Sequence, residues 1–187
     1  YRTYDVTSYL KPGAANAVGM MLGNGWYSAA SVLPWERGGP WGDGPRALLQ
    51  MTVTYDDGTK KTFVSDETWK ASSGAIGANQ LVAGETYDAR AEKPSWNTVG
   101  YDDSKWKNAS VRAAPSGKLR NELVPPMKVQ NTFKPIKMTK QSDGRWLYEF
   151  DRYFSGWVRL NIKGKAGDKI TIQYELGEKD VYILKGD

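Results

Sequence analysis

The chain has 187 residues, 40 % of them hydrophobic, with eight Trp and eleven Tyr, so it can bury a core and disorder is not expected. It has no Cys and no His, which excludes disulfides, thiolate nucleophiles, Ser-His-Asp catalysis and His-ligated metals. Its formal net charge of +5 comes from Lys and Arg scattered among acidic neighbours, which predicts a solvated surface and no nucleic-acid partner. No apolar run approaches the roughly 20 residues that span a membrane, so no membrane partner is expected.

Gly and Pro punctuate the whole chain. The twenty Gly and nine Pro divide it into short elements, as in an all-β protein. The first strand is predicted in the apolar run of residues 16–22, where the turn Gly23-Asn24-Gly25 would end it as a buried strand. Residues 38–44, GGPWGDG, are too rich in Gly and Pro for a helix or a central strand and predict a loop.

The strongest local signal is a β-hairpin. Apolar side chains alternate with polar ones along residues 47–55, and the alternation continues in residues 60–65. Between the two runs lies Asp56-Asp57-Gly58-Thr59, and Asp-Gly is among the strongest hairpin-turn signals. A further short strand is expected at residues 69–72.

The pattern becomes irregular further along the chain. Trp96, Tyr101 and Trp106 follow no helix or strand spacing, so we expect them to anchor an irregular segment, residues 94–110, onto the core. Residues 115–126 mix Pro, Gly, Lys and Glu and predict an extended linker. A domain boundary is placed there, between residues 1–126 and residues 127–187.

Strand patterns return after the linker. Four further strands are predicted, at residues 133–139, 146–150, 157–163 and 169–174. Val158, Leu160 and Ile162 would share one face of the third. No internal repeat and no helix longer than a turn or two is expected.

A glycosidase of ordinary mechanism needs two carboxyl groups that face each other across the sugar. The acidic candidates form no spaced pair of that kind, and strand and turn positions explain them. These candidates are Glu36, Asp43, Glu85, Asp88, Glu149 and Asp151. We therefore predict no catalytic residue and no metal ligand in this chain.

Four aromatic residues cluster within sixteen residues of Gly- and Pro-rich sequence: Trp26, Tyr27, Trp35 and Trp41. Exposed rings on the loops of a β-sandwich can stack on the apolar face of a sugar, while nearby amides and carboxylates bind its hydroxyls. Alternatively, the rings fill the end of the sandwich core. Both interpretations stay open at this point.

Several segments, in this order, carry a family resemblance: Tyr4-Asp5-Val6-Thr7, Leu10-Lys11-Pro12-Gly13, Leu22-Gly23-Asn24-Gly25-Trp26-Tyr27, Tyr55-Asp56-Asp57-Gly58-Thr59, Ser65-Asp66-Glu67-Thr68-Trp69-Lys70, Gly84-Glu85-Thr86-Tyr87-Asp88-Ala89-Arg90 and Tyr101-Asp102-Asp103-Ser104-Lys105-Trp106. Over residues 1–128 they resemble the amino-terminal domain of bacterial α-L-rhamnosidases of glycoside hydrolase family 78. From residue 129 the chain resembles the start of the next β-sandwich, with Ser155-Gly156-Trp157-Val158-Arg159-Leu160 as a matching piece. The resemblance implies an all-β fold: a jelly-roll-like, galactose-binding-like β-sandwich followed by part of a second, concanavalin-like β-sandwich.

The family hydrolyses terminal α-L-rhamnose with acidic residues of an (α/α)6 barrel, and this chain lacks the dozen amphipathic helices of such a barrel. The resemblance thus implies a non-catalytic accessory fragment. In some members the similar domain is a rhamnose-binding module of family 67 that uses calcium. A sugar-binding role is carried over to Asn24, Trp26, Glu85, Tyr87 and Asp88, and the aromatic cluster adds Trp35.

The expected partners are a rhamnose-containing glycan and the catalytic domain of the same enzyme. No cofactor is expected, unless calcium binds as in the family's binding module. The chain looks cut at both ends, and exposed strand edges there would favour self-association. A periplasmic or secreted location is favoured, and a cytoplasmic one stays open. The rival classes are an enzyme in its own right and a purely structural interaction domain without a ligand.

Overall fold

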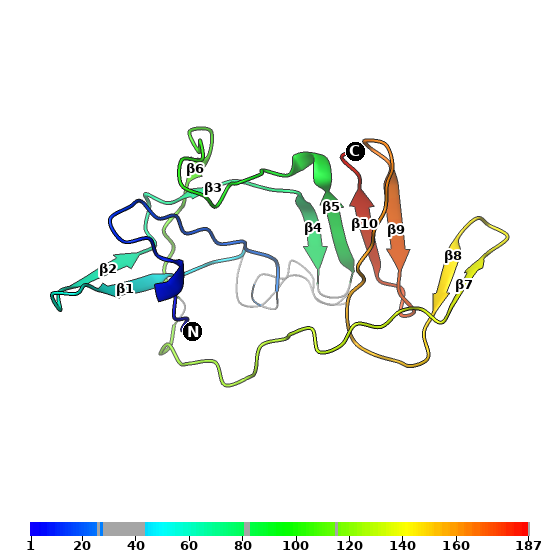
Figure 1. Ribbon diagram of the computed structural model, residues 1–187, viewed down its shortest axis with the longest axis horizontal. Helices are drawn as coiled ribbons and strands as arrows, with labels where there is room; N and C mark the ends of the chain where they lie inside the picture. Colours follow the sequence, from blue (N-terminus) through cyan, green and yellow to red (C-terminus); the bar gives the residue numbers. More distant parts are fainter. Residues whose placement is uncertain (26, 28–43, 81–82, 115, 187) are drawn as a thin grey trace. The chain divides into compact units, whose positions relative to one another are not determined.

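The computed structural model describes residues 1–25, 27, 44–80, 83–114 and 116–186 (Figure 1). Apart from two single-turn 3-10 helices, η1 (Thr7–Tyr9) and η2 (Ala89–Ala91), every regular element in these residues is a strand. This confirms the predicted all-β class. The described part of the chain holds no helix with the length and apolar character to cross a membrane.

The chain forms two compact units. One unit contains Tyr1–Asp5 and Ser116–Ile162, and the other contains Val6–Pro115 and Lys163–Asp187. The carboxy-terminal residues therefore pack with residues that precede the linker. The sequence-based division into residues 1–126 and 127–187 concerns domains rather than such units, and it stays a prediction.

The hairpin predicted around Asp56-Asp57-Gly58-Thr59 is confirmed. Strands β1 (Gln50–Thr54) and β2 (Lys60–Val64) pair antiparallel, with Gln50 opposite Val64. The Asp57 carboxylate accepts hydrogen bonds from the backbone N–H and the hydroxyl of Thr59, at 2.9 and 2.6 Å. The same bonds hold the pKa of Asp57 below its usual value. Local turn chemistry thus fixes the register of this pair.

The irregular aromatic segment is also anchored as expected. The rings of Trp96 and Trp106 stack with their centroids 6.4 Å apart, and Tyr101 meets Trp106 edge-on at 5.6 Å. A Cβ on Gly19 would lie only 2.5 Å from the Trp96 ring, so this ring packs directly on backbone. Nearby, the predicted short strand is present as β3 (Lys70–Ala71), which pairs with β6 (Lys107–Asn108).

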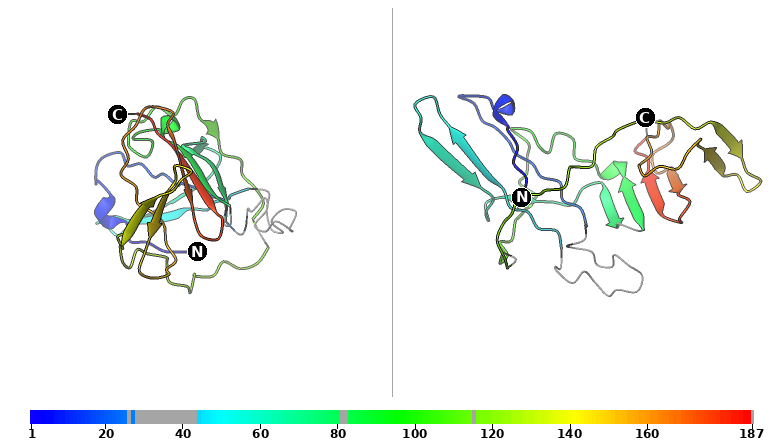
Figure 2. Two further views of the ribbon diagram at one scale, coloured as in Figure 1. Left: turned by 90° about the vertical axis from the view of Figure 1, so that its right-hand side faces the viewer. Right: turned by 90° about the horizontal axis from the view of Figure 1, so that it is seen from below.

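A four-stranded sheet forms the centre of the larger unit. Its strands are β4 (Ile76–Gln80), β5 (Gly84–Asp88), β9 (Lys169–Gln173) and β10 (Lys179–Ile183). Their order is β4-β5-β10-β9, and both views of Figure 2 show β5 beside β10. β5 and β10 run parallel, whereas the two outer pairs are antiparallel. Sequence patterns predicted β9 alone of these four strands.

In the smaller unit, β7 (Lys137–Lys140) and β8 (Trp146–Glu149) form a second hairpin. These strands confirm the predictions for residues 133–139 and 146–150 in part, since β7 begins at Lys137. Three phenylalanines pack beside the hairpin, with ring centroids 5.2 Å apart in both the Phe133–Phe154 and the Phe150–Phe154 pair.

Two predicted strands are wrong. Residues 16–22 and 157–163 form no strand, and apart from the half-buried Met20 their apolar side chains are exposed, with Met21 at 71 % and Trp157 at 65 %. An apolar run or an alternating pattern shows only that a segment suits a sheet, and a strand also needs a neighbour for its backbone N–H and C=O groups. No backbone hydrogen bond joins either segment to another in the described residues. The loop predicted at residues 38–44 lies outside the described residues except for Gly44.

Candidate functional site

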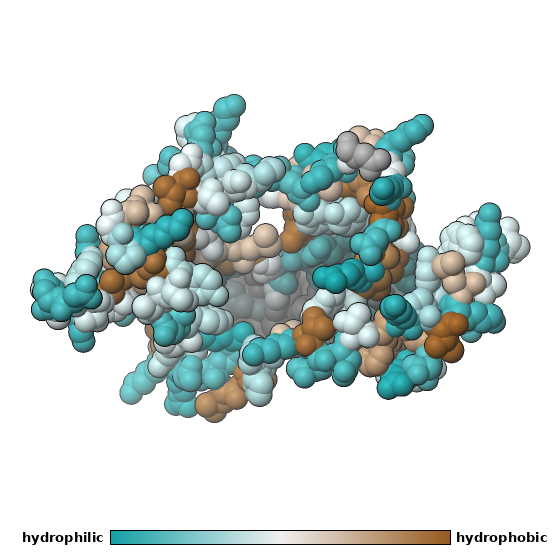
Figure 3. All heavy atoms as spheres, viewed as in Figure 1, coloured by the Kyte–Doolittle hydropathy of each residue, from teal (hydrophilic) through white to brown (hydrophobic). Residues whose placement is uncertain are grey.

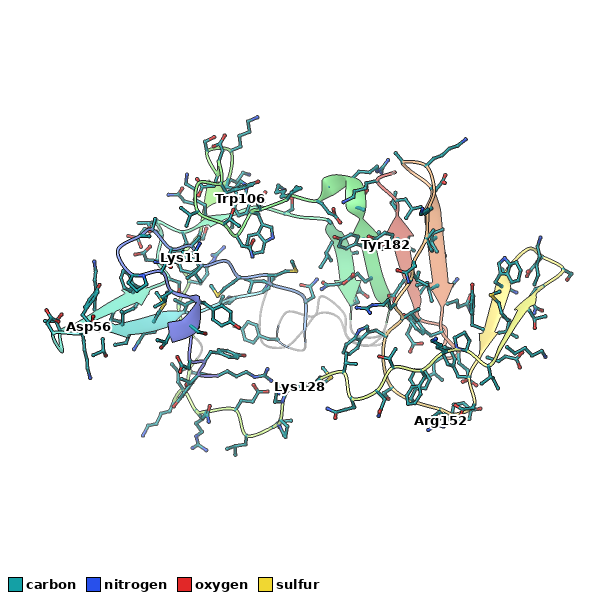
Figure 4. All side chains as sticks on the ribbon, viewed as in Figure 1. Lys11, Asp56, Trp106, Lys128, Arg152 and Tyr182 are labelled. Atoms are coloured by element: carbon teal, nitrogen blue, oxygen red, sulfur yellow. The ribbon has the colours of Figure 1, made fainter. Side chains whose placement is uncertain are left out.

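The central sheet brings two copies of one short pattern side by side. β5 carries Glu85 and Tyr87, and β10 carries Asp180 and Tyr182 with the same spacing. Because Tyr87 pairs with Tyr182 in the parallel register, and alternate side chains share a face, all four lie on one face of the sheet. Asn79 of β4 pairs with Glu85 and extends this face. These five residues are called the tyrosine face below; Figure 4 labels Tyr182 on β10.

The two tyrosine rings form the apolar part of the face. Their centroids are 5.0 Å apart and their planes differ by 10°, so the partly buried rings stack face to face. The Tyr87 hydroxyl donates to Glu92 at 2.8 Å, and Glu92 also pairs with Lys185 at 2.7 Å. Burial, followed by the bond to Glu92, raises the pKa of Tyr87 to about 12. Tyr87 is thus a neutral, oriented ring at physiological pH.

The carboxylate of Asp180, on β10, bonds to β5 and to Tyr174, the residue that follows β9. One oxygen accepts the backbone N–H of Glu85 at 2.8 Å, and the other accepts the hydroxyl of Tyr174 at 2.6 Å. Burial, then the bond to Asp180, raises the pKa of Tyr174. Burial and the nearby Asp180 charge also raise the pKa of Glu85, in that order. Asp180 is therefore held rigidly, while Glu85 keeps its own carboxyl group available.

An asparagine pair adds amide groups next to the carboxylates. The Asn24 backbone N–H donates to the Asn79 side-chain oxygen at 3.1 Å, and the Asn24 amide donates to the Asn79 backbone oxygen at 3.2 Å. Asn79 sits opposite Glu85 in the β4–β5 register. Asn24 is thereby tied to the edge of the tyrosine face.

Of the six residues predicted to bind sugar, the structure brings Asn24, Glu85 and Tyr87 together and separates Asp88. Asp88 alternates with Tyr87 onto the opposite face, where it caps η2 through the Arg90 N–H at 3.0 Å and pairs with the Arg90 guanidinium at 2.7 Å. Trp26 and Trp35 lie outside the described residues. Sugar binding by any of the six stays a prediction.

Sequence reasoning missed Asn79, Tyr174, Asp180 and Tyr182. One signal was present: Glu85-Thr86-Tyr87 and Asp180-Val181-Tyr182 share an acid-x-Tyr pattern. That pattern becomes informative only if the two strands are known to be parallel neighbours in this register, and nothing local announces such pairing.

The chemistry of the tyrosine face suits binding. Each ring of the stacked pair keeps one outer face that could contact the C–H face of a sugar, and carboxylate and amide groups can bind hydroxyls. In the described residues no three acidic side chains meet around one point, so they do not supply the carboxylate set typical of a calcium cage. Calcium binding stays a prediction.

A family model described as the alpha-L-rhamnosidase N-terminal domain matches residues 1–131. An alpha-L-rhamnosidase of Formosa agariphila is 38 % identical over 178 residues, which cover 92 % of this chain and 18 % of the relative. An alpha-L-rhamnosidase of Streptomyces avermitilis is 35 % identical over 179 residues, which cover 93 % of this chain and 17 % of that relative. The chain thus spans less than a fifth of the length of these curated relatives.

Solved structures agree with the sequence relatives. The Streptomyces avermitilis alpha-L-rhamnosidase complexed with L-rhamnose superposes with a TM-score of 0.82 at 27 % identity, covering 98 % of this chain and 19 % of that one. The alpha-L-rhamnosidase from Dictyoglumus thermophilum gives a TM-score of 0.69 at 36 % identity, and the match covers 79 % of this chain and 18 % of that one. By its matching model, its relatives and its fold, the chain belongs to the alpha-L-rhamnosidase N-terminal domain family.

Proposed function

We propose that this chain is a non-catalytic supporting segment of an α-L-rhamnosidase and that its tyrosine face binds sugar weakly. The whole enzyme would hydrolyse terminal α-L-rhamnose from glycans or glycosides, and this segment would support the catalytic domain. The observation that carries the sugar-binding part is the stacked pair Tyr87–Tyr182 beside Glu85 and Asp180. The relative crystallised with L-rhamnose supports rhamnose as the first sugar to test.

The affinity should be low. Each ring contributes on the order of 1 kcal/mol to stacking and each hydrogen bond to a sugar hydroxyl about as much, so two of each give a dissociation constant roughly in the millimolar range. Such a site is useful chiefly through tethering, because attachment to the catalytic domain keeps that domain near its glycan at a high effective concentration.

A titration of the 187-residue chain with L-rhamnose, followed by NMR of the tyrosine ring protons, tests the binding. We expect saturable shifts of Tyr87 and Tyr182 and their loss in Tyr182→Ala. Tyr9→Ala serves as the matched control, because Tyr9 is 80 % exposed and belongs to η1 rather than to the four-stranded sheet. A flat titration up to roughly tens of millimolar sugar would reject sugar binding.

An assay with an aryl α-L-rhamnoside tests the absence of catalysis. The chain alone should show no turnover above that of buffer, since the paired carboxyl groups of a glycosidase have not been located in it. Turnover that copurifies with the chain and disappears in Glu85→Gln would overturn the non-catalytic assignment.

A purely structural interaction domain is the second candidate, and one observation favours it. Among the described residues only Ala89 is a buried hydrophobic side chain, 4 % exposed, whereas Leu123 and Met127 are 92 % and 94 % exposed. Apolar side chains accordingly appear in several places on the visible surface (Figure 3). A surface with many exposed apolar side chains is typical of one that packs against another domain.

A further inference from the structure

Both charged side chains of the tyrosine face itself, Glu85 and Asp180, carry carboxyl groups. Glu92 is bonded to Tyr87 at the other end of the face. Lys185 is the cation paired with Glu92, at 2.7 Å, so its charge is already compensated. No other salt bridge in the described part of the chain reaches these residues.

The neighbouring strand positions do not neutralise this charge. Lys169 pairs with Ile183, and Lys179 with Gln173, which places both lysines in the alternate set of positions, on the opposite face from Tyr182. Arg90 is engaged by Asp88, also away from Tyr87. Within these strands, the charged side chains that share the face of Tyr87 and Tyr182 are therefore carboxyl groups.

Asp180 is the more firmly oriented of the two carboxyl groups on the face. Its two oxygens are fixed by the hydrogen bonds that they accept from the Glu85 N–H and from the Tyr174 hydroxyl. Each carboxylate oxygen keeps a further lone pair for a sugar hydroxyl, which can donate a hydrogen bond. A carboxylate on the sugar cannot donate a hydrogen bond, and the Asp180 carboxylate would repel it at hydrogen-bonding distance because the two charges are alike.

We propose that the tyrosine face selects neutral sugar rings over uronic acids and that Asp180, positioned by Tyr174, sets this selectivity. The inference rests on the proposed sugar binding and adds the class of sugar that the face accepts. Stacking on Tyr87 and Tyr182 treats both sugar classes alike, so the discrimination comes from the carboxyl groups.

The experiment compares two ligands that differ in one charge. The 187-residue chain is titrated at pH 7 with D-galacturonate and with its methyl ester, and L-rhamnose is titrated in parallel. The tyrosine ring protons report binding in each case. We expect the ester to bind at least about tenfold more tightly than the acid, the effect of one like-charge contact near a protein surface.

Three variants assign the effect. Asp180→Asn removes the charge and should bring the ester and the acid to within about threefold of each other. Tyr174→Phe keeps the charge and should preserve the preference, though with weaker binding of both ligands. Glu67→Gln removes an exposed charge in a turn remote in sequence from the sheet, and it should change neither affinity.

The outcomes separate this inference from the proposed function. Absence of rhamnose binding would reject the sugar-binding function itself. Rhamnose binding combined with equal affinity for ester and acid, or with no binding of either, would overturn the selectivity while leaving sugar binding intact. A preference that persists unchanged in Asp180→Asn would remove Asp180 from its assigned role.

Discussion

Gly84 lies against the backbone carbonyl of Lys179, so closely that a Cβ at position 84 would overlap the carbonyl oxygen. The contact occurs where β5 enters its parallel pairing with β10. Gly84 also has a φ of +89°, in the region that favours glycine. The position is therefore restricted twice, by conformation and by space.

Gly84→Ala should lower the free energy of unfolding by about 2 to 4 kcal/mol, because conformational strain adds to the overlap with Lys179. Gly58→Ala is the matched control: Gly58 has a φ of +80° but nothing within 4 Å of its Cβ position. That control should lose only about 1 kcal/mol. Urea denaturation measures both, and equal losses would contradict the tight β5–β10 contact.

Glu85→Gln should stabilise the chain at neutral pH. Burial and Asp180 raise the pKa of Glu85, so the folded state binds its proton more tightly than the unfolded state does. Stability from this group is therefore complete at low pH and falls as the pH rises from about the ordinary value of 4.5 through the raised value. The variant, which carries no charge at any pH, should lack that fall.

Glu92→Gln should have the opposite effect on stability at neutral pH. The bonds from Lys185 and then Tyr87 lower the pKa of Glu92. The ionised carboxylate therefore stabilises the folded state at pH values above the ordinary carboxyl pKa, and this stabilisation is lost as the pH falls through the lowered pKa. This variant should be less stable at pH 7 than the parent chain. Thermal unfolding between pH 3 and 8 compares Glu85→Gln and Glu92→Gln with the parent chain. If both substitutions changed the stability at pH 7 in the same direction, this electrostatic description of the face would be contradicted.

Tyr87→Phe should change the response to alkali. Because the pKa of Tyr87 is raised to about 12, the folded state holds the phenolic proton while the unfolded state has lost it, and stability falls between pH 10 and 12. Tyr87→Phe removes this fall, although it also loses the bond to Glu92. Tyr153→Phe, at a side chain 89 % exposed, is the control. Ultraviolet absorbance of tyrosinate follows the titration, and ionisation of Tyr87 near pH 10 would refute the prediction.

Trp106→Ala should destabilise the larger unit by about 2 kcal/mol or more, because it removes both the stack with Trp96 and the edge contact with Tyr101. Tyr4→Ala, at a ring 69 % exposed, should have little effect. The midpoint of thermal unfolding distinguishes them. A Trp106→Ala variant as stable as the parent would mean that these rings do not anchor the irregular segment.

Residues acting on near neighbours were predictable from the sequence. The Asp56-Asp57-Gly58-Thr59 turn, its two strands and the all-β class all follow from local chemistry, since the turn's own side chain supplies its hydrogen bonds. The same holds for the anchoring role of Trp96 and Trp106, for which composition and irregular spacing sufficed. Of the candidate site, the sequence identified Glu85, Tyr87 and Asn24 through a family resemblance.

What the sequence by itself determined was therefore the class of structure and the residues able to turn, stack or hydrogen-bond locally. Only the tertiary structure decided that β5 and β10 are parallel neighbours. This pairing places Asp180 and Tyr182 on the tyrosine face with Tyr87, whereas Asp88 lies on the opposite face of the sheet. The physical reason is that a strand's backbone groups are satisfied by a partner strand elsewhere in the chain, here 95 residues away, where Tyr87 pairs with Tyr182. For the same reason the alternating residues 157–163, without such a partner in the described chain, form no strand.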